Sequence, residues 1–105
     1  MTIMPNRVSQ KDAYNGFHFM PAIGQKHDIV GLVLYQSSTP IDTNAGRVYS
    51  HFHVIQDEMG KLYHYKGSSF YPLHSKVAIR ATIKGYCRDK TSMRMITIIK
   101  APKSL

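Results

Sequence analysis

The sequence predicts an all-β fold, a small five-stranded antiparallel barrel. Its 105 residues are enough for one domain with a modest core. Runs rich in β-branched and aromatic residues are separated by clusters of glycine, proline, serine and aspartate. A single open sheet of this size would leave its edges unpaired and one face poorly covered, so we expect closure. The predicted strands cover residues 28–36, 47–56, 61–66, 76–84 and 93–100.

The first predicted strand contains Gly31 within an otherwise apolar run. A glycine in such a position marks a β-bulge or a sharp bend, which a strand shared by two sheets requires. The following residues, 37–46, include Pro40 and Gly46 and are predicted to form a loop.

The segment 47–66 is predicted to be a hairpin in which polar aromatic residues alternate along the strands. If residues 57–60 make a four-residue loop, His53 lies opposite His64. The outward face then carries Arg47, Tyr49, His51, His53, His64 and Lys66. The inward face carries Val48, Phe52, Val54, Tyr63 and Tyr65. A slip of one residue would exchange these assignments.

The rest of the chain follows simpler patterns. In the strand 76–84, four alternating residues are predicted to face inward: Val77, Ile79, Ala81 and Ile83. Residues 67–75 are too short and broken for a helix, so the end of the barrel is expected to be plugged by Phe70, Tyr71, Phe17 or Phe19. Residues 1–16 are polar and aperiodic and are predicted to be a flexible arm, which leaves 17–105 as the barrel domain.

Composition points to a polyanionic partner. The chain has 14 Lys and Arg against six Asp and Glu, a net charge of +8 with neutral histidines. Such a balance favours nucleic acid, and less often an anionic membrane surface. Cys87 is the only cysteine, which excludes an internal disulfide and fits a reducing compartment. No apolar leader or membrane-length segment is present, so we expect no membrane association and a cytoplasmic location, or a nuclear one in a eukaryotic host.

A row of flat rings among cations can stack bases and neutralise phosphates. The turn at 85–92 and the residues that follow it strengthen this interpretation, because the span 86–94 places one ring among three cations. The residues predicted to bind nucleic acid are Arg47, Tyr49, His51, His53, His64, Lys66, Arg80, Lys84, Tyr86, Arg88, Lys90 and Arg94. The competing interpretation is that aromatic and β-branched residues simply favour exposed strands.

A metal site is the second alternative. Imidazoles at i and i+2 with a cross-strand partner can reach one ion, so His51, His53 and His64 are candidates. The segment partly resembles the first cupin motif, with Glu58 as the acidic residue, but Gly60 comes too early and the second cupin motif is absent. Paired carboxylates and Gly-rich phosphate loops are also missing. We therefore predict no metal, no cofactor and no catalytic residue.

Three segments together resemble the OB-fold, and in particular OB-type domains of phage and plasmid replication proteins. They are Ile23–Val33 with its glycine entry, Ile55–Tyr65 with its acid-x-x-glycine turn, and Val77–Lys84. The resemblance implies a ligand groove across the second and third strands, between residues 37–46 and 85–92. It also implies a non-enzymatic protein that binds single-stranded nucleic acid, DNA rather than RNA, in replication, recombination or repair. The alternative is a structural or adaptor subunit that contacts another protein or a second copy of itself.

Overall fold

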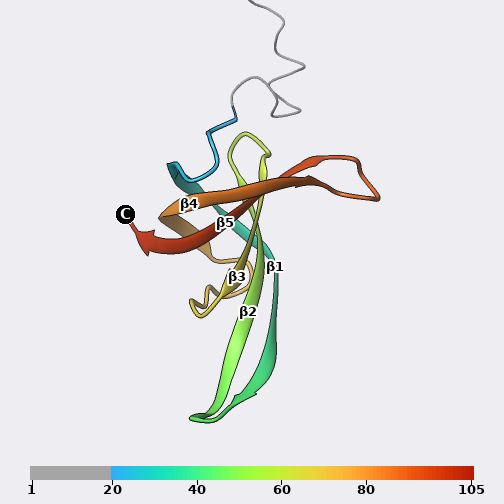
Figure 1. Cartoon of the computed structure of the whole chain (residues 1–105). Coiled ribbons are helices and arrows are strands. Elements are labelled where there is room, and N and C mark those ends of the chain that lie inside the picture. The colour runs from blue at the N-terminus through green and yellow to red at the C-terminus, as the bar shows by residue number, and fades with distance from the viewer. Residues whose placement is uncertain (1–19) are drawn as a thin grey trace, which may run out of the picture.

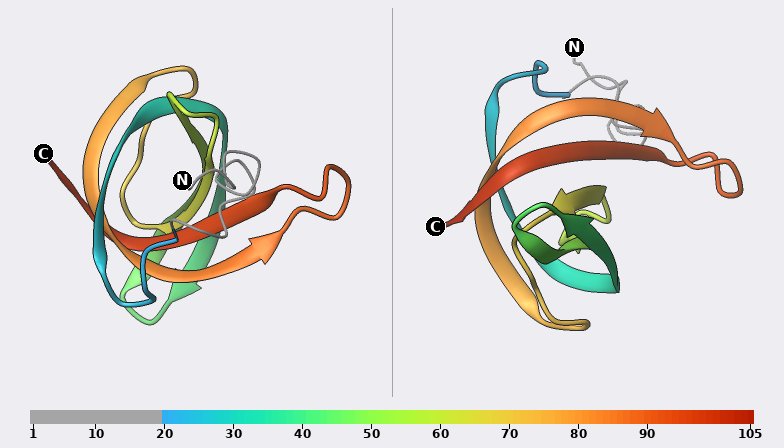
Figure 2. Two further views of the ribbon diagram at one scale, coloured as in Figure 1. Left: turned by 90° about the horizontal axis from the view of Figure 1, so that it is seen from above. Right: turned by 60° about the horizontal axis from the view of Figure 1, so that its bottom comes forward.

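Five strands close into a barrel in the computed structural model of the chain, which describes residues 20–105. The strands follow the order β1-β2-β3-β5-β4 around the barrel (Figures 1 and 2). Their bounds are Lys26–Thr43 for β1, Gly46–Asp57 for β2, Leu62–Gly67 for β3, Lys76–Arg88 for β4 and Met95–Ser104 for β5. The predicted fold class, a small five-stranded all-β barrel, is confirmed.

The barrel is mixed rather than purely antiparallel. Strands β3 and β5 pair in parallel, from Leu62 opposite Ile96 to Tyr65 opposite Ile99. All other neighbouring pairs are antiparallel. The expectation of a wholly antiparallel barrel was therefore wrong at this closing pair. Local patterns report on hairpins, whereas this pair joins strands that are distant in sequence.

Strand β1 is shared by both neighbours, as expected from its glycine. It pairs with β4 as far as Leu32 and with β2 from Gly31 onward. A Cβ atom on Gly31 would lie 2.3 Å from the carbonyl oxygen of Gln56, so only glycine fits where the two ladders meet. The register shift itself lies between Val33 and Tyr35, beyond the glycine.

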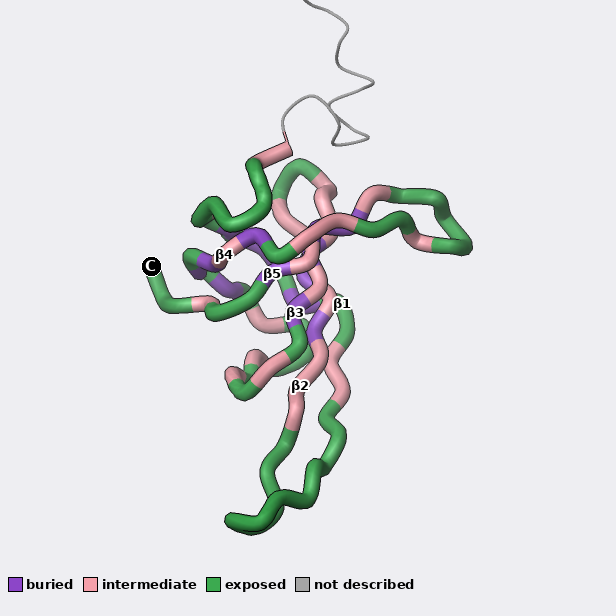
Figure 3. Tube along the Cα trace, in the orientation of Figure 1, coloured by how far each residue is buried: buried purple, intermediate pink, exposed green. Residues whose placement is uncertain are grey.

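Residues 37–46 are not the predicted loop. Strands β1 and β2 stay paired here, from Ser37 opposite Phe52 to Thr43 opposite Gly46. They extend away from the barrel as a two-stranded arm, residues 37–50, which is distinct from the predicted N-terminal arm (Figure 1). Neither β3 nor β4 pairs with this part of the hairpin, so the arm is largely exposed (Figure 3). Similarly, β4 continues to Arg88, into the predicted turn 85–92.

The core fills the inside of the barrel. The buried apolar cluster contains the four alternating residues predicted on β4, with Ile29, Val33, Ile55, Tyr63, Tyr65 and Ile99. Tyr71 packs against this cluster, which confirms it as part of the plug, whereas Phe70 stays exposed. Phe17, Phe19 and the predicted arm 1–16 lie outside the described residues. No helix in the described part is long and apolar enough to cross a membrane.

The register of the β2–β3 hairpin differs from the prediction by one residue. His53 lies opposite Tyr65, and His64 lies opposite Val54. The turn has five residues because the Asp57 carboxylate accepts the backbone N–H groups of Met59 and Lys61, both at 2.9 Å, while Gly60 adopts a φ of 85°. The faces of β2 are consequently exchanged, whereas those of β3 are as predicted.

Candidate functional site

Three rings lie on neighbouring strands on the outside of the barrel. Tyr35 comes from β1, Phe52 from β2 and His64 from β3. The ring centroids of Tyr35 and Phe52 are 6.1 Å apart, and those of Phe52 and His64 are 5.1 Å apart with the planes at 84°. Tyr35 is 52% exposed, and the other two rings are half-buried. We call these three rings the outer aromatic face.

A cation lies directly beside the middle ring. Lys66 on β3 is opposite Phe52 in the antiparallel ladder and is exposed. The pKa of His64 is lowered, mainly by its burial and partly offset by the nearby Asp89 carboxylate. His64 is therefore a neutral ring at pH 7, and positive charge on this side comes from lysine and arginine.

The loop between β4 and β5 is held in shape beside the His64 end of this face. The Asp89 carboxylate accepts the backbone N–H groups of Thr91 at 3.1 Å and Ser92 at 2.6 Å, and hydrogen bonds from Ser92 lower the pKa of Asp89. Arg88 donates to the carbonyl oxygen of Met93 at 2.7 Å. Arg94 donates to the carbonyl oxygen of Gly60. The predicted cations Arg88, Lys90 and Arg94 thus sit on an ordered loop tied to the β2–β3 turn.

Tyr86 is not the surface ring that was predicted next to these cations. Its hydroxyl donates to the carbonyl oxygen of Pro21, and its half-buried ring packs against the core. Burial raises the pKa of its phenol. Tyr86 therefore supports the barrel and offers no ring face at the surface of the loop.

His53 lies inside the barrel with 0% exposure, so the prediction that it stacks on bases was wrong. Its Nε2 accepts the backbone N–H of Tyr71 at 3.0 Å, and its Nδ1 lies 3.4 Å from the carbonyl oxygen of Tyr65. These partners assign the neutral tautomer with the proton on Nδ1. Burial is the main cause of its lowered pKa. We call His53, Tyr65 and Tyr71 the inner cluster; their centroids lie 5.3 to 6.2 Å apart.

Tyr49 and His51 lie on the arm face that continues this inner side. Their rings stack at 6.4 Å with an interplanar angle of 13°, and His51 meets the edge of Phe70 at 5.2 Å. The Nδ1 of His51 is 2.7 Å from the Ser38 hydroxyl. The four predicted stacking rings of the hairpin are therefore not on one face, and only His64 is on the outside of the barrel. Phe52 was missed because the turn at Asp57 was predicted one residue too short. Tyr35 was missed because the register of β1 shifts between Val33 and Tyr35, so that Tyr35 faces outward next to the exposed Leu34.

The remaining predicted cations lie elsewhere. Arg47 pairs with Asp42 at 3.0 Å near the tip of the arm. Arg80 donates through Nε and Nη2 to the two carboxylate oxygens of Asp28, at 2.7 and 3.2 Å. Arg80 and the exposed Lys84 are on β4, which is separated from β2 by β1 and from β3 by β5. They are thus on the opposite side of the barrel from the outer aromatic face.

The three histidines of the metal hypothesis do not converge. His53 is inside the barrel, His64 is outside it and His51 bonds to Ser38 on the arm. Within residues 20–105, no group of three or more histidine, cysteine or acidic side chains is placed to hold a metal ion. The geometry gives no support to the cupin-like alternative.

No protein-family model, no curated protein and no solved structure matches this chain. Flat rings next to an exposed ammonium group provide apolar surface and positive charge together. Such surfaces stack nucleobases and neutralise phosphates.

Proposed function

We propose that the protein binds single-stranded nucleic acid, DNA in preference to RNA, through the outer aromatic face, and that it serves replication, recombination or repair without catalysing a reaction. The observation that carries this proposal is the set of three rings on adjacent strands with Lys66 opposite Phe52. The net charge of +8 supports a polyanionic ligand. The preference for DNA rests on the resemblance to OB-type replication domains.

Stacking provides affinity with little sequence preference. Every base has a π-face, and each stacked base contributes about 1–3 kcal/mol. Tyr35 and Phe52 offer the exposed ring surface, and Lys66 meets the backbone beside them. The β4–β5 loop adds the cations of Arg88, Lys90 and Arg94 at the His64 end. Because the loop is already ordered, little conformational entropy is lost when it contacts a strand.

A titration of labelled oligonucleotides tests this function. Single-stranded DNA, single-stranded RNA and duplex DNA of one length are compared at two salt concentrations by fluorescence anisotropy. We expect single-stranded DNA to bind most tightly, with an affinity that falls as salt rises because counterions are released. Absence of binding to single strands at low salt would overturn the proposal.

An abasic strand of equal length is the matched control for stacking. It keeps the phosphates and removes the bases, so charge alone still acts on it. We expect its affinity to be at least about tenfold lower, because a single stacked base contributes about 1–3 kcal/mol. Equal affinities for the two strands would exclude stacking on Tyr35 and Phe52.

A structural or adaptor subunit is the second candidate, and one feature favours it. Val30, Leu32 and Leu34 on the outer side of β1 are 41%, 48% and 43% exposed. A contiguous exposed apolar row is typical of protein-binding surfaces. Analytical ultracentrifugation of the wild type and of Leu32→Asn tests self-association. A dimer that becomes a monomer in the variant would support this candidate, and a monomeric wild type would remove a second copy as the partner.

A further inference from the structure

The outer side of β4 and its two neighbours carries a second set of cations. Lys26, Thr82 and Lys100 lie directly opposite one another on β1, β4 and β5. Asp28, Arg80 and Lys103 make the next row along the same strands. We call Lys26, Arg80, Lys100 and Lys103 the basic surface, and all four are exposed.

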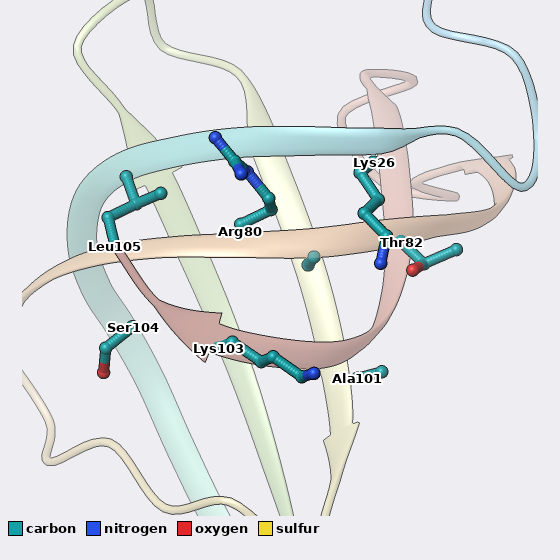
Figure 4. A pocket seen from close by; sticks show the side chains of 8 residues that line it. Lys26, Arg80, Thr82, Ala101, Lys103, Ser104 and Leu105 are labelled. Atoms are coloured by element: carbon teal, nitrogen blue, oxygen red, sulfur yellow. The ribbon is translucent and has the colours of Figure 1, made fainter.

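Part of this surface is hollow. A cavity of about 430 Å³ opens between the three strands and is lined by the side chains shown in Figure 4. The register of β4 and β5 shifts between Arg80 and Thr82, opposite Ala101, whose φ is 52°. This irregularity bends the end of β5. Hydroxyl groups of Thr82 and Ser104 lie in the lining beside the ammonium groups.

The charges of the basic surface are only partly compensated. Arg80 and Lys103 are directly opposite, and like charges in that position destabilise a sheet. Asp28 has the one carboxylate among the residues of these two rows, and Arg80 donates hydrogen bonds to both of its oxygens. In the other row, Lys26 and Lys100 flank the neutral Thr82. A phosphate-bearing ligand would relieve this repulsion, whereas a cationic or apolar ligand would not.

The basic surface lies on the opposite side of the barrel from the outer aromatic face, and strand β5 connects the two around the barrel. Phe52 is opposite Lys66, and the parallel ladder of β3 and β5 ends one residue earlier at Tyr65 and Ile99. Lys66 and Lys100 are the next residues of the two strands after this last pair, and from Lys100 the row continues through Thr82 to Lys26. Since neighbouring strands are about 4.8 Å apart, this outer row across five strands spans about 20 Å.

We propose that the basic surface is a second phosphate-binding surface, which takes the sugar–phosphate backbone of the strand after it leaves the outer aromatic face. This inference rests on the proposed function. It adds to it the route of the bound strand, which crosses from Lys66 on β3 to Lys100 on β5. The other direction crosses the exposed apolar row of β1, which offers nothing to a phosphate. Lys26, Lys100 and Lys103 thereby acquire a role that sequence patterns did not indicate.

Oligonucleotide length separates the two surfaces. A strand of about 3 nucleotides, roughly 10 Å long at about 3.4 Å per nucleotide, fits within one surface, and one of about 30 nucleotides reaches both. The test variant is Lys26→Gln/Lys103→Gln, and Lys61→Gln/Lys76→Gln removes the same charge elsewhere on the surface. Anisotropy titrations at several salt concentrations give the affinity and the salt slope, and thermal unfolding verifies that each variant folds.

For the long strand, we expect the test variant to bind about tenfold more weakly at low salt and to lose about 1.4 units of salt slope, because each phosphate contact contributes about 0.7. For the short strand, and for the control variant, the affinity should change less than about twofold. Equal loss in both double variants, or no loss for the long strand, would overturn the second surface while leaving the proposed function standing. If the wild type binds neither strand, the proposed function fails and this inference fails with it.

Discussion

The outer aromatic face and the inner cluster each take two of their three rings from the β2–β3 hairpin, and both combine histidine with other aromatic side chains. His53 lies opposite Tyr65, the residue that follows His64, so the two histidines sit on adjacent strands. Yet His53 is enclosed, with partners for both ring nitrogens, while His64 lies on the outside with its ring against Phe52. The difference is the side of the sheet to which each side chain points.

This contrast separates folding from binding. Rings of the inner cluster contact one another and the core, so their stacking contributes to the free energy of unfolding. Rings of the outer aromatic face keep exposed surface that a ligand can cover. Histidine and tyrosine in an alternating pattern therefore indicate an aromatic strand, and only the register tells which rings are available to a partner.

The largest expected loss of stability comes from a substitution in the inner cluster. His53→Ala leaves a cavity at a fully buried position and removes the acceptor for the part-buried N–H of Tyr71, so we expect the free energy of unfolding to fall by about 3 kcal/mol. His64→Ala is the matched control and should cost less than about 1 kcal/mol. Urea denaturation followed by circular dichroism measures both. Similar losses in the two variants would contradict the contrast between the clusters.

Affinity for single-stranded DNA should depend on the outer aromatic face and not on the rings of the inner side. Phe52→Ala removes the middle ring of the outer aromatic face, and we expect the affinity for single-stranded DNA to fall about tenfold, within the 1–3 kcal/mol of one stacked base. Tyr49→Ala removes a ring that is 51% exposed but lies on the other face of the arm. We expect it to change the affinity less than about twofold. A larger loss for Tyr49→Ala would move the binding surface to the arm.

Acidification should weaken the fold before it titrates the carboxylates. The pKa values of His27, His53 and His64 are lowered, in each case first by burial. Below the ordinary histidine pKa of about 6.5, the unfolded chain therefore binds more protons than the folded one. Stability should be complete above that pH and decrease as the pH falls through the folded pKa values.

Thermal unfolding midpoints between pH 8 and pH 5 measure this effect. The lowered pKa values of Asp28 and Asp89 affect stability only in more acidic solution, below about pH 4, and leave this window clear. His53→Gln should reduce the pH dependence, because one of the three imidazoles with a lowered pKa is gone. A midpoint that stays constant down to pH 5 would contradict the burial of His53 as a neutral ring.

The smallest effect is expected at the tip of the arm, which belongs to neither cluster. Asp42 and Arg47 form an ion pair whose side chains are 80% and 59% exposed. Asp42→Asn should change the free energy of unfolding by less than about 1 kcal/mol, since water screens such pairs. The same urea denaturation tests it. A loss as large as that of His53→Ala would show that the arm is coupled to the barrel core.

Much of the fold could be predicted because its signals are local. The alternation of Val77, Ile79, Ala81 and Ile83 places one face of β4 in the core, and this does not depend on which strands lie beside it. Gly31 predicted a bulge or bend in a strand shared by two sheets, and it lies where β1 pairs with both β2 and β4. The cations of the β4–β5 loop were also found from sequence, since loop charges need no register to be placed at the surface.

The candidate site was harder to predict because it depends on one side chain in a turn. Asp57 accepts two backbone N–H groups and lengthens the turn to five residues, which brings Phe52 outside and His53 inside. A pattern of alternating residues is unchanged by such a slip, and each face carries rings. The pattern by itself therefore could not choose between them.

The sequence by itself determined a basic all-β chain of five strands and the inward face of β4, because composition and period-two alternation do not depend on distant partners. Only the tertiary structure decided which hairpin rings are exposed, and that β3 and β5 run in parallel. Those features arise from hydrogen bonds and pairings between residues that are separated along the chain. No local pattern records them.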